Sequence, residues 1–400
     1  MRVIYTAREK LTLDRAPSYQ IFHTLRGILE TGVDVRFVTP WPARLVRKQC
    51  ENLTGRAFPD GLEVVSLGPG PDLPGIARLW PSQVWSGIAA RLKRYLRTVR
   101  CREPDTVVYT RNRRAAAVLP KADFPPVVFE YHEPQSVVLA EEGGNTGSRS
   151  NVHRVRREEE KALENAAALV TVSRAHGEES KDLYRYAGRQ WVIPNGADPT
   201  IFSVPDAQRR PLSGQLLYIG SIKPWKGLDL LLEAMARVPT ARLTICGGNQ
   251  GSQPWQDLSS LVSRLGITDR VRMVGTLPQQ ELRPHLASAM AGILPLNGEY
   301  SIAERYTSPL KLFEYLCAGL PVVATDLPSV RNIVAHEREA LLFEDRIIGS
   351  LVASLSRLMT DGALAERLAR RARETSFQHT WRHRGERIVR VCEAVLMDAA

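Results

Sequence analysis

The chain has 400 residues, of which 44% are apolar and 24% charged. This length predicts two or three domains, and the composition excludes a disulfide-stapled mini-protein and a chain that is disordered throughout. The formal net charge is +11, of which +8 (16 basic minus 8 acidic side chains) falls in residues 1–100 and bears on the partners of that region.

Short β-branched and apolar runs alternate with amphipathic segments along the chain. This alternation predicts parallel sheets covered by helices on both faces, an α/β fold with Rossmann-like domains. We expect one helix over 19–31, ended by Gly32. A first series of strands is expected at 3–6, 33–39, 62–67, 106–110, 127–131, 169–173 and 190–193. A second series is expected at 215–219, 241–246, 271–274, 291–294 and 321–325.

A cluster of turn residues at 193–199 separates the two series of strands. We therefore expect one domain over 1–195, a second over 196–377 and a last helix over 378–400. A single large α/β domain is the alternative. Because ligands of open parallel sheets bind beyond the carboxyl ends of the strands, the site is expected between the two domains.

Cysteine usage and hydropathy indicate the compartment. The five cysteines lie far apart, which favours free thiols over a disulfide framework or a zinc site. The first residues are predicted to form a core strand instead of a signal peptide, and no apolar run approaches the roughly 20 residues of a membrane span. We expect a cytoplasmic protein, with association at the inner face of a membrane left open.

The chain lacks the glycine patterns of nicotinamide and kinase-type sites. Neither G-x-G-x-x-G after the first strand nor G-x-x-x-x-G-K-[ST] is present. The glycine-containing run 247–251 does not have the spacing of the dinucleotide fingerprint, and we interpret it as a turn.

Two other loops combine a lysine with the start of a helix. Lys226 comes directly before an expected helix, where the ammonium group and the free amides would attract a phosphate together. The loop 306–309 precedes another helix, with Ser or Thr expected as its cap, Lys311 in its first turn and Glu314 one turn later. Taken alone, Lys226 is more often a solvated surface residue, and Glu314 equally well compensates the helix dipole.

These segments resemble family 4 of the retaining GT-B glycosyltransferases. The resemblance rests on the segments 220–229, 308–314 and 318–326, on the linker-like 193–198 with Phe202, and on Phe377 and Trp381 as the opening of a last helix. It covers the whole chain and is most specific over 190–345. It implies a GT-B fold, in which two Rossmann-like domains face each other across a central cleft. The first domain would be on the acceptor side, and the second would bind the nucleotide-sugar donor.

The resemblance also implies roles for single residues. Lys226 matches the lysine that holds the donor diphosphate, Glu314 the glutamate that binds the ribose, and His132 the histidine that contacts the donor sugar. Residues expected to act in catalysis are His132, Lys226 and Lys311. Residues expected to bind the donor are Gly220, Ser221, Lys226, Val274, Gly275, Tyr306, Thr307, Ser308, Leu310, Lys311 and Glu314. Residues expected on the acceptor side are Arg15, Ser18 and Arg111.

The sequence departs from the family pattern at three places. Ser221 stands where an arginine is common, and Tyr306 stands where many members have the first of two glutamates. The usual double glycine after the first strand is replaced by residues 14–18. Because Tyr306 replaces a carboxylate and no Asp-x-Asp cluster is present, we expect a metal-independent, front-face substitution with retention.

Residues 84–99 predict a basic amphipathic helix. Its apolar stripe consists of Trp85, Ile88, Leu92, Leu96 and Val99. Such a stripe more often packs on a sheet, and the alternative is that it lies on anionic lipid. In that case the acceptor would be lipid-linked, as in bacterial polysaccharide biosynthesis.

The expected function is transfer of a hexosyl-type sugar from a nucleoside-diphosphate sugar to a hydroxyl of a glycan or lipid-linked glycan, in class EC 2.4. No cofactor and no metal are expected. The alternatives are a nucleotide-sugar epimerase of the same fold, a transferase acting on a small-molecule natural product, and a non-catalytic binding protein. No nucleic-acid-binding motif accompanies the positive charge, so no nucleic-acid partner is expected.

Overall fold

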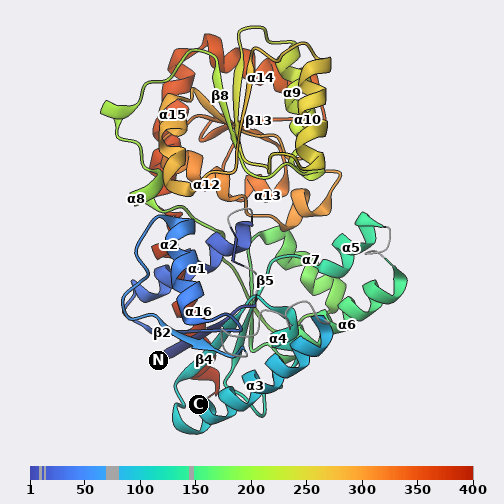
Figure 1. Cartoon of the computed structure of the whole chain (residues 1–400), viewed down its shortest axis with the longest axis vertical. Helices are drawn as coiled ribbons and strands as arrows, with labels where there is room; N and C mark the ends of the chain where they lie inside the picture. Colours follow the sequence, from blue (N-terminus) through green and yellow to red (C-terminus); the bar gives the residue numbers. More distant parts are fainter. Residues whose placement is uncertain (9–10, 13–14, 69–80, 144–147, 400) are drawn as a thin grey trace.

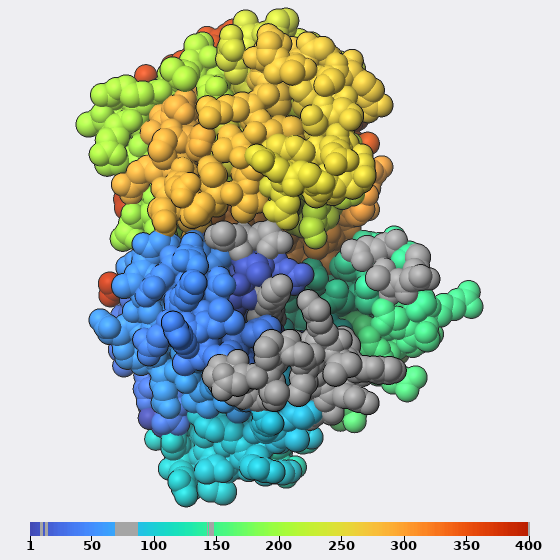
Figure 2. All heavy atoms as spheres, in the orientation of Figure 1, coloured from blue at the N-terminus to red at the C-terminus, as the bar shows by residue number. Residues whose placement is uncertain are grey.

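The computed structural model describes residues 1–8, 11–12, 15–68, 81–143 and 148–399. Figure 1 shows two lobes stacked along the long axis of the molecule, with both termini in the lower lobe. Figure 2 shows the upper lobe, yellow to orange, resting on the blue and cyan lower lobe. We call the lower one the first lobe and the upper one the second lobe.

The first lobe contains a parallel seven-stranded sheet in the order β3-β2-β1-β4-β5-β6-β7. Its strands are β1 (Arg2–Thr6), β2 (Asp34–Thr39), β3 (Glu63–Ser66), β4 (Thr106–Thr110), β5 (Val127–Tyr131), β6 (Ala168–Thr171) and β7 (Arg189–Val192). β1, β4, β5 and β6 are almost wholly buried, as expected for strands covered on both faces. All seven predicted strands are present, with ends that differ by at most two residues.

The second lobe contains a parallel six-stranded sheet in the order β10-β9-β8-β11-β12-β13. Its strands are β8 (Gln215–Ile219), β9 (Arg242–Cys246), β10 (Val271–Gly275), β11 (Ala291–Leu294), β12 (Val322–Thr325) and β13 (Ala340–Phe343). The last of these was not predicted, because it is short and contains no β-branched residue. The two sheets confirm the predicted α/β, doubly Rossmann-like fold class.

Helices cover both sheets. In the first lobe they are α1 (Ala16–Leu29), α2 (Ala43–Thr54), α3 (Pro81–Arg102), α4 (Arg113–Ala117), α5 (Gln135–Glu142), α6 (Arg149–Asn165) and α7 (Arg174–Tyr184). Between the sheets lies α8 (Pro199–Phe202). In the second lobe they are α9 (Leu228–Ala236), α10 (Gln253–Arg264), α11 (Arg283–Ser288), α12 (Leu310–Cys317), α13 (Pro328–Arg331), α14 (Ile348–Thr360) and α15 (Gly362–Ser376). The chain returns to the first lobe through α16 (Trp381–Ala399).

The last helix packs closely on α1. A Cβ atom at Gly27 would overlap the backbone carbonyl of Trp381, and one at Gly385 would overlap the carbonyl of Gly27. The two glycines therefore allow the helix backbones to touch. Phe377 does not open this helix as predicted: it ends α15, with 63% of its surface exposed. α16 begins at Trp381 after a short turn.

The basic helix α3 packs against the first sheet. Leu92, Leu96 and Val99 are buried in the core together with residues of β1, β2 and β4. The side chain of Trp85 and residues 69–80 lie outside what the structure describes. For the described part of the stripe, packing on the sheet is therefore the observed arrangement. Nowhere among the described residues is a helix both long and apolar enough to cross a membrane.

Candidate active site

Two glycine-containing loops approach each other at the carboxyl edge of the second sheet. Gly220 follows β8 with φ of 134°, and Gly247 follows β9 with φ of 147°. A Cβ atom at Gly247 would overlap the backbone of Gly220, so the two loops approach too closely for a side chain between them. Nearby, Ser221 accepts a hydrogen bond through its carbonyl from the Tyr218 hydroxyl, at 2.9 Å.

Two lysines lie at this edge. The Lys311 ammonium lies 3.5 Å above the ring of Tyr218, and the Lys226 ammonium lies 3.6 Å above the ring of Trp225. Lys311 is buried, and its Nζ atom has no hydrogen-bond partner among the residues described. A Cβ atom at Gly220 would lie 3.1 Å from that Nζ atom, so a larger residue there would crowd the lysine.

Both lysines have lowered pKa values. Burial lowers the pKa of Lys311 well below its ordinary value, and the positive charge of Lys226 lowers it further. Burial, together with the charge of Lys223, lowers the pKa of Lys226 to about 7. Lys311 therefore experiences the positive charge of Lys226 and the opposing negative charge of Glu314.

Glu314 lies on α12, one turn after Lys311, and is 6% exposed. Burial raises its pKa to about 7, against the opposing effects of Lys311 and of a hydrogen bond from the Gln279 side chain. Gln279 in turn accepts a hydrogen bond from His23 Nε2 of α1, at 2.9 Å. A chain of hydrogen bonds therefore runs from Glu314 in the second lobe to α1 in the first lobe.

The loop before α12 is fastened to the chain between the lobes. Asn195 donates to Ser308 twice, from its backbone amide to Oγ at 3.0 Å and from its side-chain amide to the carbonyl at 2.7 Å. The N-cap position is Pro309, and no side chain caps the helix. The predicted Ser or Thr cap is therefore wrong: the Ser308 hydroxyl is taken by the linker. Leu310 packs against the core of the first lobe.

Tyr306 contacts the first lobe. Its side chain is 2% exposed, and its hydroxyl donates to Glu179 of α7 at 2.8 Å. Its ring meets His176 edge-on, with 5.2 Å between the centroids. Neighbouring Thr307, which has extended backbone, follows as the C-cap of the turn Ile302–Tyr306.

His132 comes directly after β5, at the carboxyl edge of the first sheet. Its Nε2 atom lies 2.6 Å from Oε1 of the buried Glu130. Burial and the nearby charge of Arg111 lower the pKa of His132 to about 4, although Glu130 opposes both effects. Glu130 also pairs with Arg384 of α16 and accepts a hydrogen bond from Tyr109.

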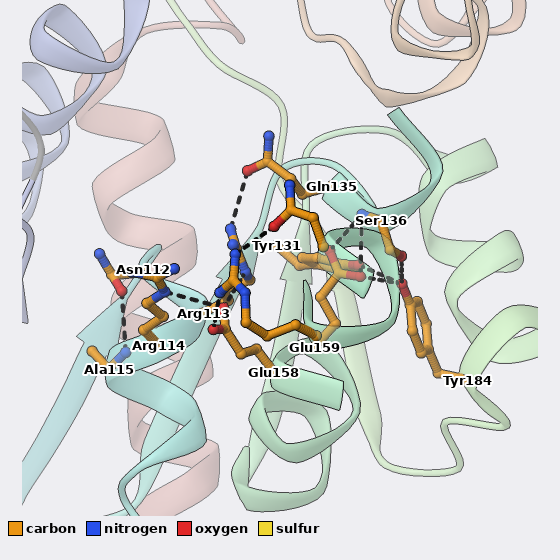
Figure 3. A network of polar contacts seen from close by, with 12 residues as sticks. Asn112, Arg113, Arg114, Ala115, Tyr131, Gln135, Ser136, Glu158, Glu159 and Tyr184 are labelled. Carbon is orange, nitrogen blue, oxygen red and sulfur yellow. Dashed lines mark hydrogen bonds and ion pairs between the residues drawn. The ribbon is translucent and has the colours of Figure 1, made fainter. Parts of the chain in front are cut away.

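A polar network joins the end of β5 and the start of α5 to α6 and α7 (Figure 3). Tyr184 donates to Glu159 at 2.7 Å, and the backbone amide of Ser136 contacts the same carboxylate at 3.4 Å. The Tyr131 hydroxyl donates a hydrogen bond to the Tyr184 hydroxyl at 3.1 Å. The start of α5 is thus anchored to α6 and α7, which fixes the segment that follows His132.

The residues expected on the acceptor side lie near the start of α1 and the end of β4. Arg111 donates to Gln20 at 2.7 Å and is close enough to His132 to lower its pKa. Arg15 is exposed at the N-cap of α1. Ser18 is fully buried and accepts a hydrogen bond from the Thr12 amide at 3.0 Å, so its hydroxyl shapes the loop before α1.

Val274 and Gly275 end β10 beside the same edge of the second sheet. The register with β9 shifts between Met273 and Gly275, where Gly275 has φ of 92°. The segment therefore lies next to the loop that follows β9, since Gly247 bridges to Gly275 and Thr276 donates to Gly248 at 3.1 Å.

Several residues of this region were not predicted. They are the partners that join distant segments: His23, Glu130, Glu179, Asn195, Gln279 and Arg384. Only Glu130 carried a signal in the sequence, as a charged residue inside an otherwise apolar strand, which indicates a buried and paired charge. Among the residues described, no group of three or more His, Cys, Asp or Glu side chains could hold a metal ion.

Comparisons with known proteins identify the family of the chain. Residues 213–361 match the family model described as Glycosyl transferases group 1, and residues 18–201 match the model described as Glycosyltransferase Family 4. The D-inositol 3-phosphate glycosyltransferase of Frankia alni is 33% identical over 227 residues, which cover 52% of this chain and 54% of that protein. The enzyme of the same name from Jonesia denitrificans is 27% identical over 262 residues, 60% of each chain. The chain therefore spans 54–60% of the length of these curated relatives.

Solved structures share the fold over the whole chain. Sucrose-phosphate synthase of Thermosynechococcus elongatus has a TM-score of 0.77 at 17% identity, and the match covers 100% of both chains. HepE of Anabaena, crystallised with UDP-glucose, has a TM-score of 0.69 at 16% identity, and the match covers 98% of this chain and 100% of HepE. Together with the two family models, which between them match both lobes, these findings show that the chain belongs to glycosyltransferase family 4 and has the GT-B fold.

Proposed function

We propose that the protein transfers a sugar from a nucleoside-diphosphate sugar, and that the diphosphate binds between Lys226 and Lys311. The observation that carries this proposal is the ammonium of Lys311, which is buried without a hydrogen-bond partner in the described structure and experiences the positive charge of Lys226. Burying a cation without a partner costs free energy, which a bound anion returns through charge-assisted hydrogen bonds. HepE, which has the same fold, was crystallised with UDP and with UDP-glucose.

We also assign neighbouring residues to the phosphates, the ribose and the base of the nucleotide sugar. The amides at the start of α12, next to Ser308 and Leu310, would bind the phosphates, because the first amides of a helix lack partners within it. Glu314 would accept hydrogen bonds from the ribose hydroxyls. The base would lie along Val274 and Gly275, and the loop Gly220–Ser221 would pass beneath the diphosphate.

The mechanism we propose is front-face substitution with retention. The acceptor oxygen bonds to the anomeric carbon while the bond from that carbon to the diphosphate oxygen breaks. A donor phosphate oxygen takes the acceptor's proton, and Lys226, Lys311 and the helix amides stabilise the charge that develops on the diphosphate. Tyr306 supplies no nucleophile in this scheme, since its hydroxyl is engaged by Glu179. Proton NMR of the first-formed product tests this step: an inverted anomer would overturn it.

For the acceptor we propose a hydroxyl of a glycan, either free or lipid-linked, approached from Arg15 and Arg111. Relatives of the chain are named as acting on inositol 3-phosphate and on glycogen, which are both rich in hydroxyls. Because residues 92, 96 and 99 of α3 are buried, any attraction to a membrane would come from exposed basic side chains and would be screened by salt. Sedimentation with anionic vesicles at low and high salt tests this: no binding at low salt would leave a free glycan as the acceptor.

The test of the donor proposal is a thermal-shift screen with UDP, GDP, ADP and dTDP, followed by their sugars. A ligand that binds the folded state raises the apparent unfolding temperature by mass action. We expect one diphosphate to raise it and its sugar to be consumed only when an acceptor is present. Consumption without an acceptor would indicate an epimerase, and the lack of any shift would contradict the donor site.

A further inference from the structure

A buried ion pair lies behind His132. Glu130 and Arg384 are each 2% exposed, and they come from β5 and α16, which are 254 residues apart in the chain. The Glu130 carboxylate accepts three hydrogen bonds: from His132 Nε2 and an Arg384 nitrogen on Oε1, and from the Tyr109 hydroxyl on Oε2. A charge at this depth is tolerated only when it is paired and fully hydrogen-bonded, and both conditions are met here.

Arg384 also holds the chain between the lobes. Its Nη1 atom donates to the carbonyl of Ile193 at 2.6 Å and to that of Pro194 at 2.9 Å, and its guanidinium lies over the ring of Trp381. Pro194 is followed directly by Asn195, which binds Ser308 in front of α12. One guanidinium therefore contacts both the partner of His132 and the linker that holds the loop of the second lobe.

The hydrogen bonds decide which nitrogen of His132 carries the proton. Burial would raise the pKa of Glu130, but the charge of Arg384 and the hydrogen bond from His132 outweigh it and lower that pKa. The group is therefore a carboxylate, which accepts hydrogen bonds and donates none. Because the pKa of His132 is lowered to about 4, the imidazole is neutral at pH 7, and its single proton must be on Nε2. Nδ1 is left with a lone pair.

We propose that Glu130 and Arg384 are positioning residues that hold His132 as the Nε2–H tautomer, with Nδ1 as an acceptor for a hydroxyl of the donor sugar, and that Arg384 fixes this arrangement to the linker between the lobes. The role given to His132 rests on the proposed function, whereas the tautomer does not. The C-terminal helix α16 thus takes part in arranging the reaction centre as well as closing the first lobe.

The first experiment needs no substrate, and it uses a variant only to assign the signal. Nitrogen-15 NMR of the full-length protein, labelled on histidine, reports the tautomer of each ring, and the His132 signal is assigned by its loss in His132→Gln. We expect His132 to be the Nε2–H tautomer at pH 7. A ring protonated on Nδ1, or rapid exchange between the two tautomers, would overturn the proposal even in a fully active enzyme.

The second experiment replaces the pair by apolar side chains of similar length, Glu130→Met with Arg384→Met. Exchanging a whole buried ion pair for apolar residues is often neutral for stability, whereas removing one partner leaves an unpaired charge. We expect the His132 signal to show both tautomers and kcat to fall about tenfold to a hundredfold, as for a misplaced contact, with little change in KM for the nucleotide sugar. Unchanged kcat together with an unchanged tautomer would refute the positioning role.

The matched control is Arg387→Met. Arg387 lies one turn after Arg384 on α16 and donates to the carbonyl of Val192, but it does not touch Glu130. If α16 acts only as a structural brace, this variant and the double variant should lower kcat equally, which would contradict the proposal. If the wild-type protein turns over no nucleotide sugar, the proposed function fails on its own, and the tautomer measurement still decides the positioning of His132.

Discussion

Replacing Lys311 by Met separates binding of the donor from stability of the fold. The ammonium is buried above the Tyr218 ring and has no hydrogen-bond partner among the described residues. In the free protein, the lost cation–π contact is worth about 0.5–2 kcal/mol. Replacement by Met also removes two unfavourable contributions to stability, the burial of the Lys311 charge and its repulsion by Lys226. We therefore expect the unfolding midpoint without ligand to stay unchanged or to rise.

The affinity of this variant for the nucleoside diphosphate should fall, although its stability should not. A hydrogen bond to a charged group contributes about 1.5–3 kcal/mol, so the loss of the Lys311–phosphate contact should weaken nucleoside-diphosphate binding by roughly 10- to 150-fold. Isothermal titration calorimetry measures the affinity, and thermal unfolding without ligand measures the stability. Lys161→Met is the control, because Lys161 is exposed on α6 of the first lobe; the affinity of this variant should change little. A Lys311→Met protein that is clearly destabilised and binds normally would refute the reasoning, since the lysine would then serve the fold alone.

Three further predictions follow from the same geometry. Lys226→Ala should abolish transfer while circular dichroism and the unfolding midpoint stay near those of the wild type, because the proposed role of this lysine is to bind the donor diphosphate. Affinity for a nucleotide sugar, whose diphosphate does not titrate near neutrality, should be highest around pH 7. Below that pH, Glu314, whose pKa burial raises to about 7, gains a proton and stops accepting from the ribose; above it, Lys226, whose pKa burial lowers to about 7, loses its charge. Gly27→Ala should destabilise the protein by about 1–3 kcal/mol in denaturant unfolding, because the added methyl group overlaps the Trp381 carbonyl.

Each of these predictions has a contradicting result. Near-normal turnover in Lys226→Ala would remove Lys226 from the site. Affinity that rises steadily from pH 7 to about 9 would contradict the charged form of Lys226 as the phosphate ligand. For Gly27, the control is Gly87→Ala in α3, where an added Cβ atom meets nothing within 4 Å. That variant should gain about 0.5–1 kcal/mol from the reduced freedom of the unfolded chain, and an equal loss in both variants would refute the close packing of α1 on α16.

The strands could be predicted because their signal is local. β4 is a continuous run of β-branched and aromatic residues, and β5 is one apart from Glu130; a parallel sheet buried on both faces requires that pattern. β13, with the sequence Ala-Leu-Leu-Phe, has no such signal and forms because it pairs with β12 over four residues. That pairing depends on tertiary context.

The candidate site was predictable only in part, because many of its contacts also depend on tertiary context. Lys226 and Lys311 each stand next to the start of a helix, which can be seen in the sequence within ten residues. The partners of these loops cannot be seen in this way, because Asn195 meets Ser308 across 113 positions and Arg384 meets Glu130 across 254. The predicted cap before α12 was wrong for this reason. Local rules assign the Ser308 hydroxyl to the start of the helix, whereas in the structure it accepts from the distant backbone amide of Asn195.

We propose that the donor's diphosphate lies between two lysines of the second lobe, Lys226 before α9 and Lys311 in the first turn of α12. A crystal structure with the nucleoside diphosphate that stabilises the protein in the thermal screen tests it most directly. We predict phosphate oxygens within hydrogen-bond distance of Nζ of both Lys226 and Lys311, with the ribose hydroxyls on Glu314. A diphosphate bound elsewhere, with Lys311 still unpartnered above Tyr218, would contradict the account.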